Sequence, residues 1–241
     1  MYPAGHTAAL TCAKKVLACA GFLLTDDPTQ ATHLLLPVPS LDGEGTVIGG
    51  APLETLLEQL PKDITVIGGN LNHPALANYR TIDLLRDPYY VSENACITAH
   101  CAVQLAMDQL PITLQDLPVL VIGWGRIGKC LADLLRRMGA DVAVAARKET
   151  DRAMLAALGY TAADTAGLDT APYRLIFNTA PVMLLPQCSG SGLKIDLASK
   201  LGMGGLDVVW ARGLPGRYAP ESSGKLIART LMRILQQEES S

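Results

Sequence analysis

The chain has 241 residues, of which 49% are hydrophobic, and it carries a formal net charge of −3 with a pI near 5.8. This length and apolar content are sufficient for two modest α/β domains with buried sheets, and we expect two domains rather than one. The slightly acidic balance and the lack of a basic cluster argue against nucleic acid as the main partner. The sequence has neither an apolar run near the roughly 20 residues that span a bilayer nor a signal-peptide pattern, so we expect a cytoplasmic protein without a membrane segment.

The six cysteines are scattered, and they form neither C-x-x-C pairs nor zinc-type spacings with the four histidines. We therefore expect no bound metal and no disulfide framework. Reduced cysteines of this kind behave as small apolar side chains. They are Cys12, Cys19, Cys96, Cys101, Cys130 and Cys188.

The first part of the chain alternates helical and strand patterns, which favours a parallel sheet. The expected helices are Thr7 to Ala20, Pro52 to Leu60 and His73 to Leu85. The expected strands are His33 to Val38 and Ile64 to Gly68, with a loop from Pro39 to Gly45 after the first strand.

The segment from Pro88 to Asn94 interrupts this alternation. A long helix is expected from Ala95 to Leu110, just before Pro111. A helix of this length between two alternating patterns is a natural connector between domains.

A dinucleotide-binding pattern begins where the apolar strand from Val119 to Ile122 meets Gly-Trp-Gly-Arg-Ile-Gly, residues 123 to 128. Gly123 permits a tight turn, Gly125 removes a Cβ that would block the phosphates, and Gly128 lets helix and strand pack closely. The apolar helix that follows offers free N–H groups and a positive dipole end to a pyrophosphate. The alternative is an ordinary strand-turn-helix unit with incidental glycines.

The next strand, Val142 to Ala145, carries information on cofactor choice at its end. Proteins that prefer NAD usually place Asp or Glu there, to accept hydrogen bonds from the ribose 2′-OH. This chain instead has Ala146, Arg147 and Lys148. The missing carboxylate removes repulsion against a 2′-phosphate, and a guanidinium can bind that phosphate through two hydrogen bonds. The pattern predicts NADP, and a solvated loop end is the alternative.

The remaining elements complete the same sheet. A helix is expected from Asp151 to Gly159, and strands are expected from Leu175 to Asn178, Lys194 to Ser199 and Asp207 to Ala211. The carboxyl ends of such strands point to the crevice where sheets of this class bind their ligands. The last helix, Ser222 to Gln237, is expected to cross back to the first domain.

These elements predict an α/β fold with a Rossmann-type dinucleotide-binding domain and a smaller flavodoxin-like α/β domain. The expected substrate-side domain comprises residues 1–94 and 222–241, the connector helix residues 95–111, and the NADP-binding domain residues 112–221.

Several short segments occur in the order seen in one family. They are Leu36 to Val38 with Gly43 to Gly45, the glycine-rich turn, Asn178 to Pro181, Ile195 to Ser199, and Gly213 to Gly216 with Ala219 and Pro220. Through these residues the chain resembles the family of dipicolinate synthase A subunits over nearly its whole length. The 2-hydroxyacid dehydrogenases and adenosylhomocysteine hydrolase share the glycine-rich turn and the general layout, but not the later segments together.

The resemblance implies NADP-dependent oxidation of a dihydrodipicolinate-type ring to pyridine-2,6-dicarboxylate in the mother cell of a spore former. It also implies a small dicarboxylate substrate and a partner that is a flavoprotein-like B subunit. Two features depart from the family pattern. The chain starts directly at a helix, without the first strand of domain one, and Thr98-Ala-His100-Cys101 stands where relatives commonly have T-x-E-G.

The candidate cofactor-binding residues lie in the glycine-rich turn and at the ends of three strands. They are Gly123, Trp124, Gly125, Arg126, Ile127, Gly128, Arg147, Lys148, Asn178, Thr179, Ala180, Pro181, Asp196, Leu197 and Ala198. Arg126 is expected to reach the pyrophosphate or a substrate carboxylate, with a solvated surface arginine as the alternative. The segment from Asn178 to Pro181 either faces the nicotinamide ribose or simply ends a strand.

Two residues are candidates for catalysis. His100 can act as an acid or base near neutral pH, and Asp196 lies in an apolar strand, where its carboxylate must be paired or face the cleft. A packed histidine and a structural aspartate are the alternatives. The candidate substrate residues are expected to come from the first domain, the connector helix and the last turn before the final helix. They are Ser40, Glu44, Thr98, Pro215, Gly216 and Arg217.

Two other functions stay open. A 2-hydroxyacid dehydrogenase is one, although that family's set of Arg, Glu and His is not recognisable at its usual spacing. A cofactor-binding partner subunit without turnover is the other, suggested by the shortened N-terminus and by His100-Cys101. The sequence does not fix the oligomeric state, and a homo-oligomer stays open as well.

Overall fold

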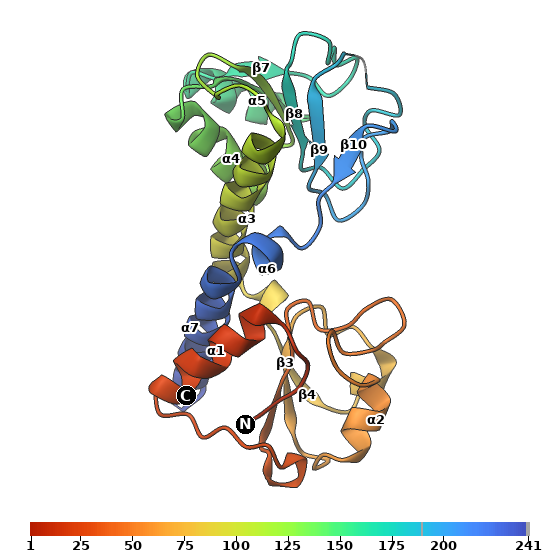
Figure 1. Cartoon of the computed structure of the whole chain (residues 1–241), viewed down its shortest axis with the longest axis vertical. Coiled ribbons are helices and arrows are strands. Elements are labelled where there is room, and N and C mark those ends of the chain that lie inside the picture. Colours follow the sequence, from red (N-terminus) through yellow and green to blue (C-terminus); the bar gives the residue numbers. More distant parts are fainter. Residues whose placement is uncertain (189, 240–241) are drawn as a thin grey trace. The chain divides into compact units, whose positions relative to one another are not determined.

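The computed structural model describes residues 1–188 and 190–239. The chain divides into two compact units, which are described separately (Figure 1). Unit 1 combines Met1–Asn94 with Pro215–Ser241, and unit 2 comprises Ala95–Leu214. The fold is α/β with two parallel sheets, as expected from the sequence.

Unit 1 contains a four-stranded parallel sheet in the order β1-β2-β3-β4. Its strands are β1 (Tyr2–Pro3), β2 (His33–Leu35), β3 (Thr65–Gly68) and β4 (Arg80–Asp83). Helix α2 (Leu53–Glu58) covers one face, because Leu53 and Leu56 pack with Leu34 and Val66 of the sheet in one buried cluster. Three single-turn 3₁₀ helices flank the strands, namely η1 (Pro28–Gln30) before β2, η2 (Pro74–Leu76) between β3 and β4, and η3 (Leu84–Arg86) after β4.

The C-terminal helix of the chain belongs to unit 1. Helix α1 (Ala8–Cys19) packs along α7 (Pro220–Glu239), as the red and dark blue ribbons in Figure 1 show. The approach is close at Gly224, where an added Cβ would lie 2.4 Å from the carbonyl oxygen of Ala9 and 2.5 Å from Cβ of Cys12. Ion pairs from α7 to other parts of unit 1 join Arg229 to Glu93 and Arg233 to Asp87. The predicted return of the final helix to the first domain is confirmed.

Unit 2 contains a six-stranded parallel sheet in the order β10-β9-β8-β5-β6-β7. Its strands are β5 (Pro118–Ile122), β6 (Asp141–Ala145), β7 (Thr161–Ala163), β8 (Leu175–Asn178), β9 (Leu193–Asp196) and β10 (Val208–Trp210). Numbered within the unit, this order is 3-2-1-4-5-6, the dinucleotide-binding arrangement. Helices α4 (Arg126–Arg137) and α5 (Glu149–Ala157) follow β5 and β6. The predicted Rossmann-type domain is confirmed.

The core of unit 2 explains why the strands are continuous apolar runs. Residues Val119 to Ile122 of β5 are fully buried, and Leu120 and Ile122 pack with Ile176 of β8 in one cluster. A central parallel strand is covered on both faces, so it does not alternate apolar and polar residues.

Three expectations about unit 1 are wrong. The chain does not start directly at a helix, because Tyr2–Pro3 form β1 and pair in parallel with β2. The segment His73 to Leu85 is not one helix but η2, strand β4 and part of η3. The segment Pro88 to Asn94 does not break the structure, because helix α3 (Pro88–Gln109) already begins at Pro88. Proline is favoured in the first turn of a helix, where its missing N–H would have no partner.

Besides β4, the sequence analysis did not expect the short strands β1 and β7, the 3₁₀ helix η1 or the five-residue helix α6 (Leu214–Tyr218). Within residues 1–188 and 190–239, no helix is both long enough and apolar enough to cross a membrane. The same residues include no group of three or more His, Cys, Asp or Glu side chains placed to hold a metal ion.

Candidate functional site

The carboxyl ends of β5 and β8 lie side by side at the centre of the unit 2 sheet, where the strand order reverses. Open α/β sheets bind ligands at such a switch point. The glycine-rich turn leaves β5 here, and the segment from Asn178 to Pro181 leaves β8. Thr179 joins the two, because its N–H and its hydroxyl both donate to the carbonyl oxygen of Ile122, at 2.8 and 3.0 Å.

The three glycines of the turn meet different surroundings. An added Cβ would lie 2.5 Å from Oγ1 of Thr179 at Gly123, where φ is +104°, and 2.1 Å from the carbonyl oxygen of Gly123 at Gly128. Both glycines are therefore required by the packing of the chain itself. Gly125 differs, because nothing in the described chain lies within 4 Å of its added Cβ. Open space beside the middle glycine is what close approach of a pyrophosphate requires.

Helix α4 begins at this open position. Gly125 is its N-cap residue, and no side chain caps the helix. A helix N-terminus without a side-chain acceptor presents N–H groups and a positive dipole end to an anion. Arg126, the first residue of the helix, is exposed. These features fit a dinucleotide pyrophosphate.

Trp124 contacts two side chains of unit 2. Its ring meets Tyr160 edge to face, with centroids 5.8 Å apart, and the ammonium group of Lys129 lies 5.7 Å from its centroid. Ile127 is half-buried in the first turn of α4. The ring contacts of Trp124 favour a packing role for this residue.

The end of β6 places two exposed basic residues, Arg147 and Lys148. Within the described part of the chain, neither side chain makes an ion pair. Arg152 of α5 fixes this turn, because its Nη1 donates to the carbonyl oxygens of Ala146 and Arg147 at 2.9 and 2.8 Å. The guanidinium of Arg152 also pairs with Asp164 at 3.0 Å. Sequence reasoning missed Arg152, whose position four residues after Lys148 was the only local signal.

The segment after β8 is a self-contained turn. Nδ2 of Asn178 donates to the carbonyl oxygen of Ala180 and to Oδ2 of Asp196, both at 3.0 Å, and Oδ1 accepts from the N–H of Ala180 at 3.1 Å. Asn178 is fully buried, whereas Pro181 is exposed. The amide of Asn178 thus shapes the strand end, and any contact with a ribose falls to the rest of the segment.

Asp196, a candidate for both catalysis and cofactor binding, is fully buried at the end of β9. Oδ2 accepts from Nδ2 of Asn178 at 3.0 Å and from the N–H groups of Gly202 and Met203 at 2.7 and 3.1 Å. Oδ1 accepts from the N–H of Ala198 at 2.9 Å. Four donors compensate the loss of water around the carboxylate. This arrangement favours a role in shaping the loop after β9, where Leu197 and Ala198 are buried.

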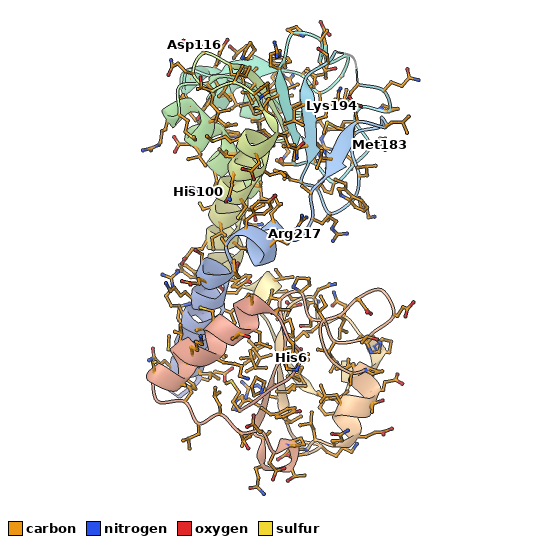
Figure 2. The ribbon with its side chains drawn as sticks, in the orientation of Figure 1. His6, His100, Asp116, Met183, Lys194 and Arg217 are labelled. Atoms are coloured by element: carbon orange, nitrogen blue, oxygen red, sulfur yellow. The ribbon has the colours of Figure 1, made fainter. Side chains whose placement is uncertain are left out.

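The segment Thr98-Ala-His100-Cys101, which differs from the family pattern, lies in the part of helix α3 that belongs to unit 2. Thr98 is buried, and His100 is exposed. Figure 2 labels His100 on this helix. No hydrogen bond or ion pair of the imidazole is found within residues 1–188 and 190–239. The histidine is therefore not the packed and hydrogen-bonded residue of the alternative interpretation.

The candidate substrate residues of unit 1 have different surroundings. Ser40 is fully buried, and its hydroxyl donates to the carbonyl oxygen of Pro37 at 2.8 Å and accepts from the N–H of Gly69 at 2.9 Å. Glu44 is exposed in the loop after β2. Ser40 thus joins the segments that follow β2 and β3, and its hydroxyl already acts as both a hydrogen-bond donor and an acceptor within the chain.

The residues Pro215, Gly216 and Arg217 lie within helix α6 rather than in a turn. Gly216 and Arg217 are exposed, and the guanidinium carbon of Arg217 lies 5.7 Å from the ring centroid of Tyr218. Figure 2 labels Arg217 on this short helix. Leu214 belongs to unit 2 and Pro215 to unit 1, so α6 spans the boundary between the units.

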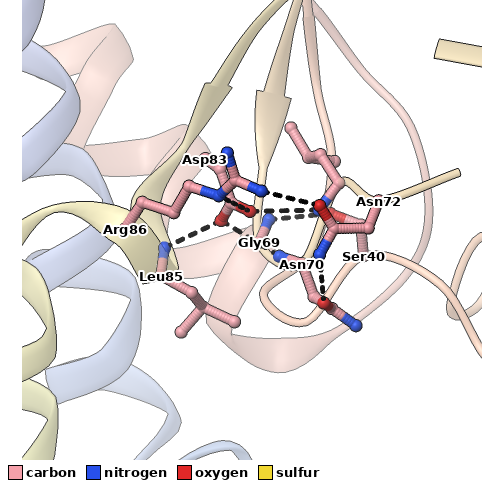
Figure 3. Close-up of polar contacts among 8 residues, drawn as sticks. Ser40, Gly69, Asn70, Asn72, Asp83, Leu85 and Arg86 are labelled. Carbon is pink, nitrogen blue, oxygen red and sulfur yellow. Dashed lines mark hydrogen bonds and ion pairs between the residues drawn. The ribbon is translucent and has the colours of Figure 1, made fainter. Parts of the chain in front are cut away.

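A polar cluster at the carboxyl edge of the unit 1 sheet was missed by sequence reasoning (Figure 3). Asp83, the last residue of β4, accepts from the N–H groups of Asn70, Leu71 and Leu85 at 3.0, 3.1 and 2.9 Å. Arg86 lies beside it, with Nε 3.8 Å from Oδ2 of Asp83. The only signal was an Asp and an Arg three positions apart, and the segment was assigned to a helix instead of a strand end.

Comparison with known proteins agrees with the resemblance found in the sequence. No protein-family model matches the chain. The A subunit of dipicolinate synthase from Bacillus subtilis (strain 168) is 27% identical over 232 residues, covering 86% of this chain and 78% of that protein. The chain is thus similar to a dipicolinate synthase A subunit over most of its length.

Two solved structures share the fold. The A subunit of dipicolinate synthase from Bacillus halodurans superposes with a TM-score of 0.85 at 21% identity, covering 97% of this chain and 96% of that chain. The corresponding structure from Bacillus subtilis superposes with a TM-score of 0.79 at 21% identity, covering 99% and 96%. The Rossmann-type two-domain fold inferred from the sequence is therefore confirmed.

Proposed function

We propose that this protein is an NADP-dependent oxidoreductase subunit of the dipicolinate synthase type. It would oxidise a dihydrodipicolinate-type ring to pyridine-2,6-dicarboxylate. The similarity to the dipicolinate synthase A subunit supports the reaction class. One observation carries the cofactor. The open space at Gly125, at the uncapped start of α4, follows strand β5, and the neighbouring strand β6 ends just before Arg147 and Lys148.

The chain's own residues would bind and align the reactants. The glycine-rich turn and the N-terminus of α4 hold the pyrophosphate, and Arg147 with Lys148 holds the 2′-phosphate. Bound NADP supplies the hydride acceptor. Because loss of hydride and a proton leaves an aromatic ring, positioning the ring against the nicotinamide is the main task of the protein.

His100 is the proposed proton acceptor. Its imidazole is exposed on α3, and no partner within the described residues competes for it. Asp196 has four donors on its carboxylate, so in this proposal it positions the loop after β9 and the buried Asn178. Thr98, Arg126, Arg217 and Glu44 are proposed to contact the substrate.

The proposal also covers partners and location. The reaction would take place in the cytoplasm of the mother cell of a spore-forming bacterium, and the partner would be a flavoprotein-like B subunit. The relative is one subunit of a synthase, which supports a partner subunit. A homo-oligomer of this chain is compatible with it.

A cofactor-binding partner subunit without turnover is the second candidate function. The carboxylate of Asp196 is fully occupied by hydrogen bonds within the chain, which favours this candidate. The two functions make different predictions about activity, because a partner subunit would bind NADP but would not oxidise the ring by itself or with a B subunit.

Nucleotide binding tests the cofactor assignment. Titration with NADPH and NADH can be followed by quenching of tryptophan fluorescence, because one of the two tryptophans, Trp124, lies within the glycine-rich turn. We expect NADPH to bind more tightly than NADH. The variant Arg147→Ala should weaken NADPH binding by about 10- to 100-fold, because one charge-assisted phosphate contact is lost, and the affinity for NADH should not change. Lys62→Ala, an exposed lysine of unit 1, is the matched control. Equal affinity of the unaltered protein for both nucleotides would contradict the assignment.

Product formation tests the reaction. Pyridine-2,6-dicarboxylate should form from the dihydro ring and NADP when a B-type subunit is supplied, and His100→Gln should reduce kcat. Absence of product both with and without the B-type subunit, with NADPH binding intact, would favour the partner subunit. Turnover of a simple 2-hydroxy acid instead would favour a 2-hydroxyacid dehydrogenase.

A further inference from the structure

The carboxyl edge of the unit 1 sheet presents a group of polar side chains outside the dinucleotide site (Figure 3). The segments after β2, β3 and β4 meet here. Asp83 is only 8% exposed, and its carboxylate accepts three backbone N–H groups, which tie the segment after β3 to η3. Ser40 ties the segment after β2 to Gly69. Both residues build the edge and leave no free polar group for a ligand.

Arg86 is the charged group that stays accessible at this edge. Its side chain is 73% exposed. Nη2 donates to Oδ1 of Asn72 at 2.8 Å, and Nδ2 of Asn72 in turn donates to Oδ1 of Asn70 at 3.3 Å. Nε is 3.8 Å from Asp83, which is longer than a hydrogen bond. The guanidinium is therefore held in place at one nitrogen, and it keeps donors for another acceptor.

We infer that Arg86, oriented by Asn72, binds a carboxylate group at the carboxyl edge of the unit 1 sheet. This inference rests on the proposed function, because it assigns the site to one carboxylate of the dicarboxylate substrate. A planar guanidinium matches a carboxylate through two parallel hydrogen bonds, and open parallel sheets bind ligands outside the carboxyl ends of their strands. Three backbone N–H groups already compensate the negative charge of Asp83, so this carboxylate does not require Arg86 as a counter-ion. In this inference Arg86, rather than Ser40, is the residue that binds the substrate at this edge of the sheet.

Calorimetric titration of the full chain with pyridine-2,6-dicarboxylate in the presence of NADP tests the site. Arg86→Ala should weaken binding by about 10- to 100-fold, and Arg86→Lys should recover part of it, because the charge is kept but the two-point contact is lost. Arg80→Ala is the matched control, since Arg80 is an exposed arginine at the other end of β4. In the coupled assay Arg86→Ala should raise KM more than it lowers kcat. NADPH affinity should not change.

The outcomes separate this site from the proposed function. If the unaltered protein binds the dicarboxylate and Arg86→Ala binds it equally well, the site is wrong and the function stands. If the unaltered protein binds NADPH but no dicarboxylate, the proposed substrate class is wrong and the site fails with it. A substrate-independent fall in the unfolding midpoint of Arg86→Ala, with KM unchanged, would assign Arg86 to stability only and would also overturn the inference.

A second site rests on a different observation, a pair of thiols in unit 2. Cys96 of α3 and Cys130 of α4 are both free, and their sulfur atoms are 2.8 Å apart. Cys96 is exposed and Cys130 is half-buried, so small oxidants can reach the pair. A disulfide bond is about 2.05 Å long, so a shift below about 1 Å brings the sulfurs to bonding distance.

We propose that Cys96 and Cys130 are a site of reversible oxidation that links α3 to α4 when a peroxide is present. The thiolate of Cys96 attacks hydrogen peroxide, which leaves a sulfenic acid on Cys96 and releases hydroxide, which becomes water on protonation. Cys130 then attacks that sulfur, the S–O bond breaks, and the proton of Cys130 leaves with the hydroxyl group as water. In total the two thiols lose two protons and two electrons, and one hydrogen peroxide molecule becomes two water molecules.

The order of attack follows from the surroundings of Cys130. Burial, together with the neighbouring thiol, raises the pKa of Cys130 to about 12. Because the thiolate is the nucleophile, the exposed Cys96 reacts first and Cys130 resolves it.

Peptide mapping after peroxide treatment tests the pair. The reduced full chain should yield a crosslinked peptide containing Cys96 and Cys130, which a dithiol reductant removes. Cys96→Ser should give no crosslink, Cys130→Ser should stop at oxidised Cys96, and Cys12→Ser, on α1 of unit 1, should crosslink normally. Crosslinks that instead join other cysteines, or independent oxidation of Cys96 and Cys130 without a crosslink, would overturn the proposal.

Discussion

Gly125 and Gly128 stand three residues apart in one turn, yet a methyl group would meet empty space at the first and a backbone oxygen at the second. Gly125→Ala should therefore leave the free energy of unfolding within about 0.5 kcal/mol of the original value, because its φ of −81° is open to alanine. The same change should weaken NADPH binding, because the methyl group enters the space of the pyrophosphate. Urea unfolding and NADPH titration measure the two effects.

Gly128→Ala provides the comparison for that prediction. Its methyl group would lie 2.1 Å from a carbonyl oxygen that cannot move away freely. We expect this variant to lose about 1–3 kcal/mol of stability. If Gly125→Ala is destabilised to the same extent, or if it binds NADPH normally, the open space at Gly125 has no role in nucleotide binding.

Asp87 provides a pH-dependent contribution to stability. Partial burial disfavours its charged form, but hydrogen bonds from the N–H of Tyr90 and from Arg233 outweigh this and hold the pKa of Asp87 below its ordinary value. Because the pKa is lower in the folded chain than in the unfolded chain, the stabilisation is complete above about pH 4 and is lost as the pH falls through the folded-state pKa.

The variant Asp87→Asn tests this contribution. An asparagine can still accept from the N–H of Tyr90, but it loses the charge that faces Arg233. At neutral pH the variant should be less stable by on the order of 1 kcal/mol, and the difference should shrink in acid. Urea unfolding of both proteins between neutral pH and about pH 3 measures it. A difference that stays constant over this range would show that the charge is not involved.

At the residue scale, sequence reasoning located correctly the residues whose position depends on the nearby sequence. Gly123 and Gly125 come shortly after the buried strand β5, and Arg147 comes shortly after β6, so their place at the carboxyl ends of these strands could be predicted. Ser40 and Asp196 could not be assigned in this way, because their roles depend on partners from other strands. Ser40 bonds to Gly69, 29 positions away, and Asp196 bonds to Asn178, 18 positions away.

At the scale of elements, the contact between α1 and α7 depends on the missing side chain of Gly224. Gly224→Ala would place a Cβ 2.4 Å from a backbone oxygen of α1, and we expect it to cost about 1–3 kcal/mol. Ser222→Ala, at an exposed position of the same helix, should change stability by less than about 0.5 kcal/mol. Thermal unfolding followed by circular dichroism compares the two. An unchanged midpoint for Gly224→Ala would mean that the helices can move apart without cost.

The errors in predicting elements have physical causes. Strand β4, Arg80–Asp83, is exposed or only half-buried at each position, so it lacks the apolar run that identified β3. Strand β7 has only three residues, two of them alanines, and β1 has two. Pairing with a neighbouring strand stabilises such short segments, and their own sequences do not. Helix α3 was started seven residues too late because Pro88 was taken as a break rather than as the first helical residue.

At the scale of the whole molecule, the two units offer separate unfolding signals. Both tryptophans of the chain, Trp124 and Trp210, lie in unit 2, so their fluorescence follows this unit alone. NADPH at about 100 times its Kd should stabilise unit 2 by about 2.7 kcal/mol. The fluorescence transition should then move to higher temperature. The part of the circular dichroism signal that comes from unit 1 should still be lost at the original temperature. Identical transitions with and without NADPH would show that the units unfold as one.

Unit 1 is formed by two segments that are far apart in the sequence, and this has a consequence for its synthesis. Its first part ends at Asn94 and its second begins at Pro215, so the ribosome completes all of unit 2 before it makes helix α7. During that interval helix α1 lacks helix α7, against which it packs in the folded chain. Unit 2 has no such delay, because its segments are contiguous. During translation unit 2 would therefore fold first, and the N-terminal residues would stay exposed to chaperones and proteases until the last helix emerges.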